Sequence, residues 1–498
     1  MSKKTKLITG LLLLAMMQNI YYGCGDRFAD KTVQEGFELA QSYCIACHKF
    51  PEPDMLDKTT WREHVLPMMA PNLGYKYFMG QYMEGVAGKS TITVNQWNSI
   101  VQYYVSQAPE AIMASEDLPV IQSGTALFSD TSVRVHSGIP LSTMVFIDTV
   151  QRQILLGDGI LEKIYGLDER LAVQNSVKTG SGPVAVYCTD SGRFVLTMGV
   201  LTPSDALAGK LWFAKSGTDA VQIVLDSLRR PVHMLFDDLD DDGLTDIVLC
   251  EFGFKQGALS WWQNTGNGYR KQVLRALPGA VNTLVYDFNQ DGKKDIIALM
   301  AQGDEGVFIY FNDGGGKFTE QRLLQFSPCY GSNHITLADI NQDGFMDIVT
   351  TNGDNGDYPP ILKPYHGIRI FLNDQKNNFS EALFLPVNGV GKVIVRDFDQ
   401  DGDPDMASIA YFPDFEHRLE EAFVYWENTG DMQFKPSTVP GVNFGRWLTM
   451  DAGDIDGDGD DDIVLGNADF GLGDIPAVER KRRRDTSVSL LVITNHLR

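Results

Sequence analysis

The sequence contains few basic residues and few histidines or cysteines for its length. Its 498 residues include 42 Lys and Arg against 65 Asp and Glu, which gives a formal net charge of -23 at pH 7. A nucleic-acid partner would need a basic face for its phosphates, so this excess of acid argues against one. The hydrophobic fraction of 43% is typical of a globular protein, and the length allows two or more cores.

The apolar run at the N-terminus is too short to span a membrane permanently. It covers residues 7–17, follows three lysines, and is followed by small residues and Cys24. This order is typical of a bacterial export signal. We therefore expect residues 1–23 to be a signal peptide, and the mature protein to work in the periplasm or at the outer membrane or cell surface.

The end of this signal, Tyr21-Tyr22-Gly23-Cys24, resembles a lipoprotein cleavage site. At such a site the cysteine is lipidated and becomes the mature N-terminus. Tyr21 departs from the pattern, which usually has Leu there, and the alternative is an ordinary signal peptide followed by a free thiol. The resemblance implies a lipid anchor on Cys24, followed by a linker over residues 24–32.

Cysteine is also scarce in the rest of the chain. Two of the six cysteines belong to the motif described next, and the three beyond them are an odd number, widely spaced and mostly flanked by strand-like residues. We expect buried free thiols at Cys188, Cys250 and Cys329.

Cys44, Cys47 and His48 form the sequence C-x-x-C-H, which attaches haem in c-type cytochromes. Two thiols at this spacing can add to the two vinyl groups of one porphyrin edge, and the next imidazole can then ligate the iron. The alternatives are a redox dithiol and half of a zinc site, but no second Cys pair lies nearby to complete a zinc set. We predict one covalent haem c, with His48 as the proximal ligand.

Two helices should enclose this haem in a small all-α domain over residues 33–109. Val33, Phe37 and Ala40 recur at helical spacing before the motif. Thr93 and Gln96 form a capping box before a second apolar stripe, which contains Trp97, Ile100, Val101 and Tyr104. A domain of this size has little core of its own, so the haem would be a large part of it.

The second axial ligand is left open by the residues between the two helices, which include four methionines and His64. A thioether ligand would raise the reduction potential and suit electron transfer. Residues 50–104 resemble cytochrome domains that are fused to repeat proteins in environmental bacteria, with Trp61 and a Leu-Pro-x-Met string at 66–69. That resemblance implies Met69 as the sixth ligand, with Met68, Met79 and Met83 as alternatives.

An acidic string recurs five times after about residue 125, where short apolar strands and turns rich in Gly and Asn replace the helical periods. The copies begin at Asp238, Asp287, Asp339, Asp397 and Asp454, and an apolar run follows each of them. Acidic or amide side chains stand at positions 1, 3 and 5, Gly at position 6 and Asp at position 9. The starts lie about 50 to 60 residues apart, which fits one four-stranded propeller blade per repeat.

Oxygen ligands on such tight loops suit calcium. No copy carries the Glu at position 12 of an EF-hand, and strands rather than helices flank the loops, so we predict up to five hairpin calcium sites that rigidify the fold. The proposed side-chain ligands are Asp238, Asp240, Asp242 and Asp246; Asp287, Asn289, Asp291 and Asp295; Asp339, Asn341, Asp343 and Asp347; Asp397, Asp399, Asp401 and Asp405; and Asp454, Asp456, Asp458 and Asp462.

Two further blades without an acidic loop are predicted at 143–159 and 183–199, which makes seven. The chain ends without the outermost strand of its last blade, and we expect residues 127–135 to supply that strand and close the ring. The repeats resemble the FG-GAP or VCBS repeats that also form the integrin head. The resemblance implies a multidomain chain in which an all-β seven-bladed propeller over residues 125–498 follows a linker at 110–124.

The loops between strands two and three of each blade should gather on the face opposite the acidic loops. A polar funnel there could hold a carbohydrate, a cationic substrate or a metal. The residues expected at this funnel are Glu251, Asp304, Glu305, Asn352, Asp354, Asn355, Asp357, Asp414, Asn467, Asp469 and the connection 329–334.

Two functions fit these features. In the first, the protein is a single-haem electron carrier, and the propeller docks it to a redox partner protein or another ligand. In the second, the protein is a periplasmic oxidoreductase whose funnel binds a substrate and whose haem accepts the electrons. The second should require a further cofactor, and the histidines are scattered singly rather than clustered for copper. We therefore expect an electron carrier rather than an enzyme.

Overall fold

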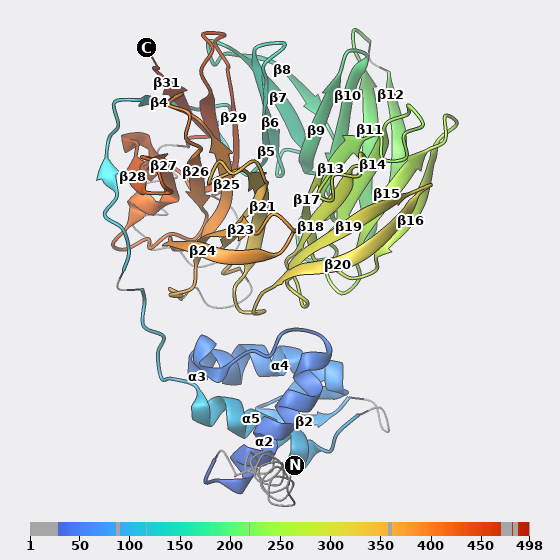
Figure 1. Cartoon of the computed structure of the whole chain (residues 1–498), viewed down its shortest axis with the longest axis vertical. Helices are drawn as coiled ribbons and strands as arrows, with labels where there is room; N and C mark the ends of the chain where they lie inside the picture. The colour runs from blue at the N-terminus through green and yellow to red at the C-terminus, as the bar shows by residue number, and fades with distance from the viewer. Residues whose placement is uncertain are drawn as a thin grey trace, which may run out of the picture. The chain divides into compact units, whose positions relative to one another are not determined.

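The computed structural model shows two compact units that divide between Ile112 and Met113 (Figure 1). It describes residues 28–85, 90–115, 117–218, 220–356, 361–469, 481 and 487–497. The expected signal peptide and Cys24 lie outside these residues. None of the described helices is long and apolar enough to cross a membrane.

The first unit is mostly helical. Its two longest helices pack against each other, with short helical turns and one hairpin between them in sequence. Its elements are α2 (Lys31–Tyr43), η1 (Cys44–Ala46), η2 (Pro53–Met55), α3 (Lys58–Thr60), the π-helical turn η3 (Trp61–Val65), α4 (Leu66–Met69), η4 (Ala70–Leu73), β1 (Tyr75–Phe78), β2 (Gln81–Glu84) and α5 (Val94–Gln107).

Both long helices begin at side-chain caps. The carboxylate of Asp30 accepts a 2.8 Å hydrogen bond from the Thr32 N–H at the start of α2. The predicted capping box of Thr93 and Gln96 is confirmed at the start of α5. The helices then bury their apolar stripes against each other, and the expected stripe residues Val33, Phe37, Ala40, Trp97, Ile100 and Tyr104 are all buried.

The expectation of an all-α first domain is wrong in one place, because β1 and β2 form an antiparallel hairpin. Tyr75–Phe78 is rich in aromatic residues, which favour strands. Met79 and Gly80 connect the strands with φ angles of 48° and 81°, as a two-residue hairpin turn with two left-handed residues requires. Local strand propensity and turn geometry therefore override the helical pattern on either side.

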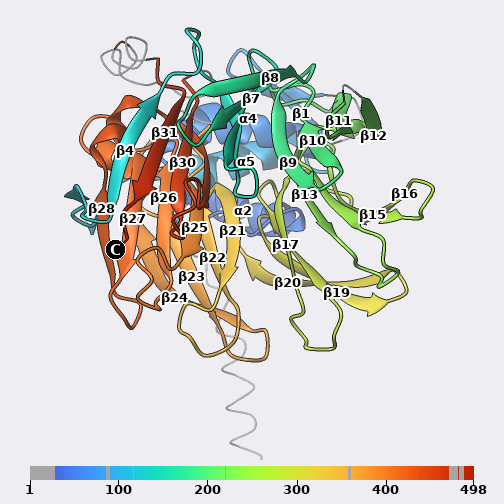
Figure 2. The ribbon, with the colours of Figure 1, turned by 90° about the horizontal axis from the view of Figure 1, so that it is seen from above.

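The second unit is a seven-bladed β-propeller with one four-stranded antiparallel sheet per blade, seen from above in Figure 2. The blades, numbered here along the chain, are blade 1, β5 (Ser142–Asp148), β6 (Gln153–Asp158), β7 (Lys163–Asp168) and β8 (Val173–Lys178); blade 2, β9 (Pro183–Thr189), β10 (Gly192–Thr197), β11 (Leu207–Lys215) and β12 (Val221–Arg229); blade 3, β13 (Pro231–Asp237), β14 (Asp246–Glu251), β15 (Ala258–Asn264) and β16 (Tyr269–Arg275); blade 4, β17 (Ala280–Tyr286), β18 (Asp295–Met300), β19 (Gly306–Gly314) and β20 (Lys317–Gln325); blade 5, β21 (Ser332–Ala338), β22 (Asp347–Asn352), β23 (Gly367–Asn373) and β24 (Phe379–Pro386); blade 6, β25 (Val390–Arg396), β26 (Asp405–Ala410), β27 (Phe423–Asn428) and β28 (Phe434–Thr438); and blade 7, β29 (Trp447–Gly453), β30 (Asp462–Asn467), β31 (Leu490–Asn495) and β4 (Phe128–Val133).

The apolar run after each acidic loop is the second strand of its blade. All six residues of β14, β18, β22, β26 and β30 are buried, because neighbouring blades cover both faces of these strands. The two predicted blades without an acidic loop are confirmed as blades 1 and 2.

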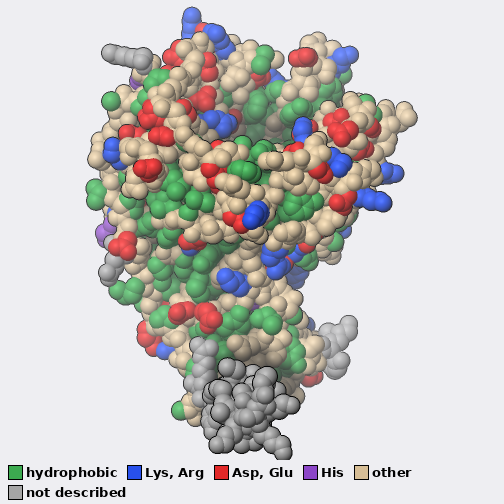
Figure 3. Space-filling view, viewed as in Figure 1, with side chains coloured by type: hydrophobic (Ala, Val, Ile, Leu, Met, Phe, Trp, Pro, Cys, Tyr) green, Lys and Arg blue, Asp and Glu red, His purple; other side chains and the backbone are tan. Residues whose placement is uncertain are grey.

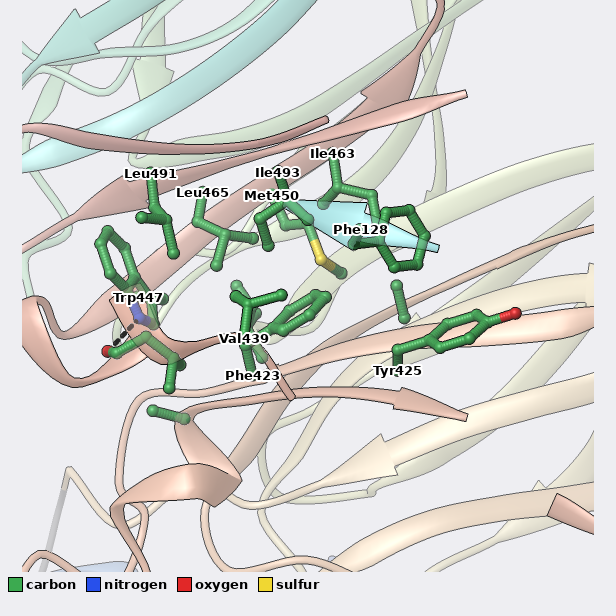
Figure 4. Packing of buried hydrophobic residues seen from close by; sticks show 14 of the residues in the cluster. Phe128, Phe423, Tyr425, Val439, Trp447, Met450, Ile463, Leu465, Leu491 and Ile493 are labelled. Atoms are coloured by element: carbon green, nitrogen blue, oxygen red, sulfur yellow. Dashed lines mark hydrogen bonds between the residues drawn. The ribbon is translucent and has the colours of Figure 1, made fainter. Parts of the chain in front are cut away.

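The predicted closure of the ring is also confirmed. β4 pairs antiparallel with β31, so an N-terminal strand completes the C-terminal blade. Figure 4 shows Phe128 of β4 packed among Ile463, Ile493 and Tyr425 from blades 6 and 7. The expected linker is shorter than predicted, because β3 (Gln122–Ser123) already pairs in parallel with the outer edge of blade 6.

The thiols of Cys250 and Cys329 are buried and free, as predicted. Cys188 is also free but only half-buried, because most side chains of its strand β9 are partly exposed. The face of the propeller drawn in Figure 3 carries separate groups of acidic side chains with lysine and arginine between them.

Candidate functional site

The C-x-x-C-H segment lies at the end of α2, where the helix tightens into the turn η1. The Cys47 N–H donates to the Cys44 carbonyl oxygen at 3.4 Å, which closes the turn. The Cys47 side chain is exposed, whereas Cys44 is partly buried. The turn therefore presents one thiol toward the helical core and the other toward solvent.

The environment of Cys44 disfavours a redox dithiol. Burial raises the pKa of the Cys44 thiol to about 11, although a hydrogen bond with Tyr104 lowers it in part. A reactive redox cysteine needs a lowered thiol pKa. Among the described residues, Cys44, Cys47 and His48 also do not converge as closely as the ligands of one metal ion would.

The ring of His48 is oriented by the backbone carbonyl group of the next residue. Its Nδ1 lies 2.8 Å from the carbonyl oxygen of Lys49, so Nδ1 carries the proton when this hydrogen bond forms. The lone pair of the neutral ring is then on Nε2. A carbonyl partner on the other ring nitrogen is the usual support of a metal-binding histidine.

The candidate sixth ligands differ in their exposure. Met68, Met79 and Met83 are 48%, 87% and 49% exposed, respectively. Met69 is half-buried at the end of α4, with the side-chain amide of Asn72 4.0 Å from its sulfur.

The indole N–H of Trp97 and the hydroxyl of Tyr82 are buried beside each other in the first unit, and their rings meet edge to face with centroids 5.4 Å apart. Burial raises the pKa of Tyr82, and a hydrogen bond from Trp97 lowers it in part. The hydroxyl hydrogen of Tyr82 then has no acceptor among the described residues, and a carboxylate could supply one.

The acidic loops connect the first two strands of blades 3 to 7, as expected. In each loop the glycine at position 6 has a left-handed backbone and donates its N–H to the carboxylate at position 1. A side chain at this φ would be strained, which explains the glycine. The N–H donations fold the acidic side chains of each loop onto one another.

Three loops bring three carboxylates close together. The groups are Asp238, Asp240 and Asp246 in blade 3; Asp397, Asp399 and Asp405 in blade 6; and Asp454, Asp456 and Asp458 in blade 7, each with one oxygen per residue within 4.8 Å of the others. In blades 4 and 5 an asparagine stands at position 3, so these loops contain fewer carboxylates. Oxygen donors in this number and spacing fit calcium.

The position-9 aspartates have a structural role that the loop pattern did not reveal. They are buried, and each accepts backbone N–H groups from its own loop and from the end of strand three, at 2.6 to 3.3 Å. Burial, with a smaller contribution from nearby carboxylates, raises the pKa of Asp405 and of Asp462 to about 7 against the opposing effect of these hydrogen bonds. A cation would relieve this repulsion.

Sequence analysis missed the side chains that link one loop to the next. Gln342 donates to the carbonyl oxygen of Gly402 and to the carboxylate of Asp403, both at 2.8 Å. Gln400 repeats the contact one blade further on, with Gly459 at 3.1 Å. Both glutamines stand at position 4 with left-handed φ angles of 57° and 55°, and an amide at this position is the only signal that the sequence offers.

Several of the expected funnel residues are occupied in contacts within or between blades. Glu251 pairs with Lys271, Asp304 with Arg275, and Asn467 accepts from the Arg446 N–H at 2.8 Å. Residues 332–334 belong to the innermost strand β21 rather than to a loop, because the chain enters blade 5 earlier than predicted. Asp357 lies outside the described residues.

Glu305 differs from these residues. It is buried and accepts from the N–H and hydroxyl of Ser332 at 3.2 and 2.9 Å. Burial raises the pKa of Glu305 to about 8, more than these hydrogen bonds lower it. The side-chain oxygens of Asn352 and Asn355 and the Nε2 of His366, which belong to the same face of blade 5, are buried without a partner among the described residues.

The fold and the five acidic hairpins define a class, the propellers built from repeated acidic hairpins. The family described as FG-GAP-like repeat matches residues 238–298, 287–350 and 397–465. The chain therefore contains FG-GAP-like repeats within a seven-bladed propeller. The curated proteins include no match to the sequence.

Comparison with solved structures finds similarity at low identity. One is a chain from a Saccharomyces cerevisiae complex of Dbp5, Nup159 and Gle1 (9% identity, TM-score 0.45, covering 77% of this chain and 100% of that chain). Another is described as a putative 6-phosphogluconolactonase of Bacteroides fragilis (12%, 0.42, 61% and 85%). A third is BBS1N in complex with ARL6DN (8%, 0.44, 74% and 96%).

Proposed function

We propose that this protein is an exported c-type cytochrome that transfers electrons through one covalent haem. Cys44 and Cys47 would hold the haem, and His48 would ligate its iron. The orientation of the His48 ring supports this proposal most directly, because its Nδ1 is bonded to a carbonyl oxygen and its Nε2 is left for the metal. When bound, the haem would supply a one-electron couple.

The remaining residues of the first unit also suit a haem. The Tyr82 hydroxyl, beside the Trp97 N–H, would donate to a propionate group. Several large apolar side chains of this unit are exposed, and a porphyrin would cover such surface. They include Ile45, Met68, Phe78, Met79 and Met83. Met69 remains the leading candidate for the sixth ligand.

The cofactors of the purified exported protein test this proposal. A spectrum of the reduced pyridine derivative reports whether the haem vinyl groups have been consumed, and elemental analysis counts iron and calcium. One haem c per chain, with calcium as the other metal, supports the electron carrier. A second haem, copper or a quinone would instead favour the oxidoreductase.

We assign calcium a structural role in the propeller. The carboxylates of each loop repel one another at close range, and an ion bound to them would stabilise the folded state by mass action. The loops of blades 3, 6 and 7 have the densest carboxylate groups and should bind most tightly. Five ions per chain would be the upper limit.

Export and a lipid on Cys24 complete the proposal. The propeller would then act as the docking module for a redox partner protein, with no nucleic acid involved. The mass of the mature N-terminal peptide tests the anchor. A diacylglycerol-modified peptide beginning at Cys24 supports it, and an unmodified thiol contradicts it.

A ligand at the funnel is a second candidate function, favoured by the surroundings of Glu305. A buried carboxyl group near unpartnered amide oxygens and an imidazole could bind a sugar or a small polar substrate. This arrangement would support the oxidoreductase reading if substrate addition reduced the haem. Reduction by a panel of sugars that is lost in Glu305→Gln would establish it.

A further inference from the structure

The innermost strands of the seven blades contain few charged side chains. Apart from residues at strand ends, their acidic and basic residues are His233 in β13, His334 in β21, Lys392 in β25 and Asp451 in β29. These strands surround the axis of the ring, so polar groups on them are either bonded to a neighbouring blade or directed into the interior.

Three of these side chains occupy the same position in their blades. In each of these blades the pairing of the innermost strand with the second strand shifts register after its first residue. The first residue paired after this shift is His233 in β13, His334 in β21 and Lys392 in β25. Asn282 occupies the same place in β17 of blade 4. Equivalent positions in a propeller have equivalent orientations. The four side chains therefore belong to one belt around the axis.

Most members of this belt bond to the innermost strand of the next blade. His233 Nδ1 lies 3.2 Å from the Thr283 hydroxyl, and Lys392 Nζ donates to the Met450 carbonyl oxygen at 2.8 Å. His334 is the exception, since its Nδ1 is buried and has no partner among the described residues. The belt thus contains an unsatisfied imidazole nitrogen directly before Lys392.

Electrostatic effects connect these groups across the ring. Burial lowers the pKa of His233 to about 4, and the positive charge of Lys392 lowers it further. Burial also lowers the pKa of His334, again with Lys392 and then His233 adding to the effect. Blades 3 and 6 are not neighbours, so the influence of Lys392 on His233 acts through the interior of the ring. All three side chains are nevertheless partly accessible to water.

The ammonium group of Lys392 is not neutralised by a direct ion pair. Among the described residues no ion pair within 4.0 Å involves it, and it donates one of its three N–H groups to the Met450 carbonyl oxygen. Burial lowers the pKa of Lys392, and the charge of Asp451 raises it in part. The Asp451 carboxylate itself accepts from the Ile147 N–H at 2.8 Å.

We propose that the interior of the propeller ring binds a small oxyanion between Lys392 and the imidazoles of His233 and His334. The ammonium group and the ring N–H groups are donors, and an oxyanion provides the acceptors that they lack. The charge of Lys392 opposes a metal cation at the same place. The site lies on the propeller axis and does not depend on the proposed haem.

Titration calorimetry with inorganic phosphate on the full-length, calcium-loaded protein tests this site, with sodium chloride at equal ionic strength as the salt control. Lys392→Met should weaken phosphate binding at least about tenfold, because a charge-assisted hydrogen bond is lost. Lys435→Met is the matched control, since Lys435 is an exposed lysine on the outer strand β28. The Lys435→Met variant should bind phosphate with the same affinity as the unmodified protein. Equal affinity in Lys392→Met, or no phosphate binding to the unmodified protein, overturns the proposal.

A second measurement needs no variant that could fail to fold. In the unmodified protein, NMR titration of the imidazole C2–H signals should show higher pKa values for His233 and His334 when phosphate is present, because a bound anion stabilises the charged rings. The groups that face these rings, Lys392, Thr283 and Asp451, are unchanged in this comparison. Unchanged histidine titrations, or shifts caused by zinc or copper but not by phosphate, contradict the site.

Discussion

The Nδ1 atom of His48 lies 2.8 Å from the carbonyl oxygen of Lys49, one residue further along the chain. This contact selects the tautomer with the lone pair on Nε2 and fixes the ring beside the turn that carries Cys44 and Cys47. The three residues of the motif thus share one short segment at the end of α2.

Replacing either thiol should prevent normal attachment of the haem. In Cys44→Ala or Cys47→Ala, one of the two thioether bonds is missing, so we expect much less haem on a denaturing gel than in the unmodified protein. Cys188→Ala is the matched control, because Cys188 is a half-buried free thiol in the propeller. Wild-type haem staining in both single variants would rule out the attachment proposed here.

Loss of the sixth ligand should change the reduction potential. Met69→Ala should remove the methionine-to-iron absorption of the oxidised protein and lower the potential by on the order of 100 mV, a fraction of the roughly 0.8 V range that axial ligands span. Met68→Leu, Met79→Leu and Met83→Leu should leave both properties unchanged. If one of these controls shows the loss instead, that methionine is the ligand.

Calcium removal should destabilise the propeller. At free calcium about 100-fold above the dissociation constant, a single ion contributes about 2.7 kcal/mol, so chelation should lower the melting temperature measured by calorimetry. Asp399→Asn should reduce the calcium effect, because Asp399 belongs to the carboxylate group of blade 6. Asp226 is an exposed aspartate outside the loops, so Asp226→Asn should leave the calcium effect on the melting temperature unchanged. An unchanged melt in chelator would exclude the structural role.

The buried Glu305 should make the protein less stable as the pH rises. Its pKa is about 8 in the folded chain and near 4.5 when unfolded, so its contribution is fully present below pH 4.5 and is lost as the pH rises through 8. The effect is at most a few kcal/mol. Glu305→Gln should flatten the dependence of the free energy of unfolding on pH in this range, measured by denaturant titration. Parallel curves for the two proteins would show that Glu305 is ionised at neutral pH.

The closing strand should be essential for the ring. Phe128 is buried between blades 6 and 7, and truncation of such a phenylalanine typically costs about 3 to 5 kcal/mol. Phe128→Ala should therefore lower the free energy of unfolding by about this amount. Leu127→Ala, at a partly buried neighbour in the same cluster, should have a smaller effect. Equal effects would mean that the strand contributes little specific packing.

Sequence predicted the propeller because its signals are local and repeated. The glycine at position 6 and the aspartate at position 9 recur at a fixed offset from an apolar strand, so five blades and their hairpin loops followed from spacing, and two strand pairs without an acidic loop brought the number to seven. Even the closing strand could be found, because blade 7 lacked a fourth strand that residues 127–135 could supply.

Contacts between blades could not be predicted in this way. The belt that contains His233, His334 and Lys392 depends on how the innermost strands align around the axis, and His334 was expected in a loop. The hairpin at 75–84 was missed for a different reason, since four-residue strands are too short for a clear alternating pattern. The geometry around the C-x-x-C-H turn likewise depends on packing against α5, through Tyr104.

The intact mass of the protein purified from the exported fraction of a haem-competent host tests the central claim most directly. We predict the mature chain plus one haem, and this haem should stay attached after denaturation and acid extraction. A mass equal to that of the polypeptide without haem, from cells that load other c-type cytochromes normally, would contradict the assignment of Cys44, Cys47 and His48.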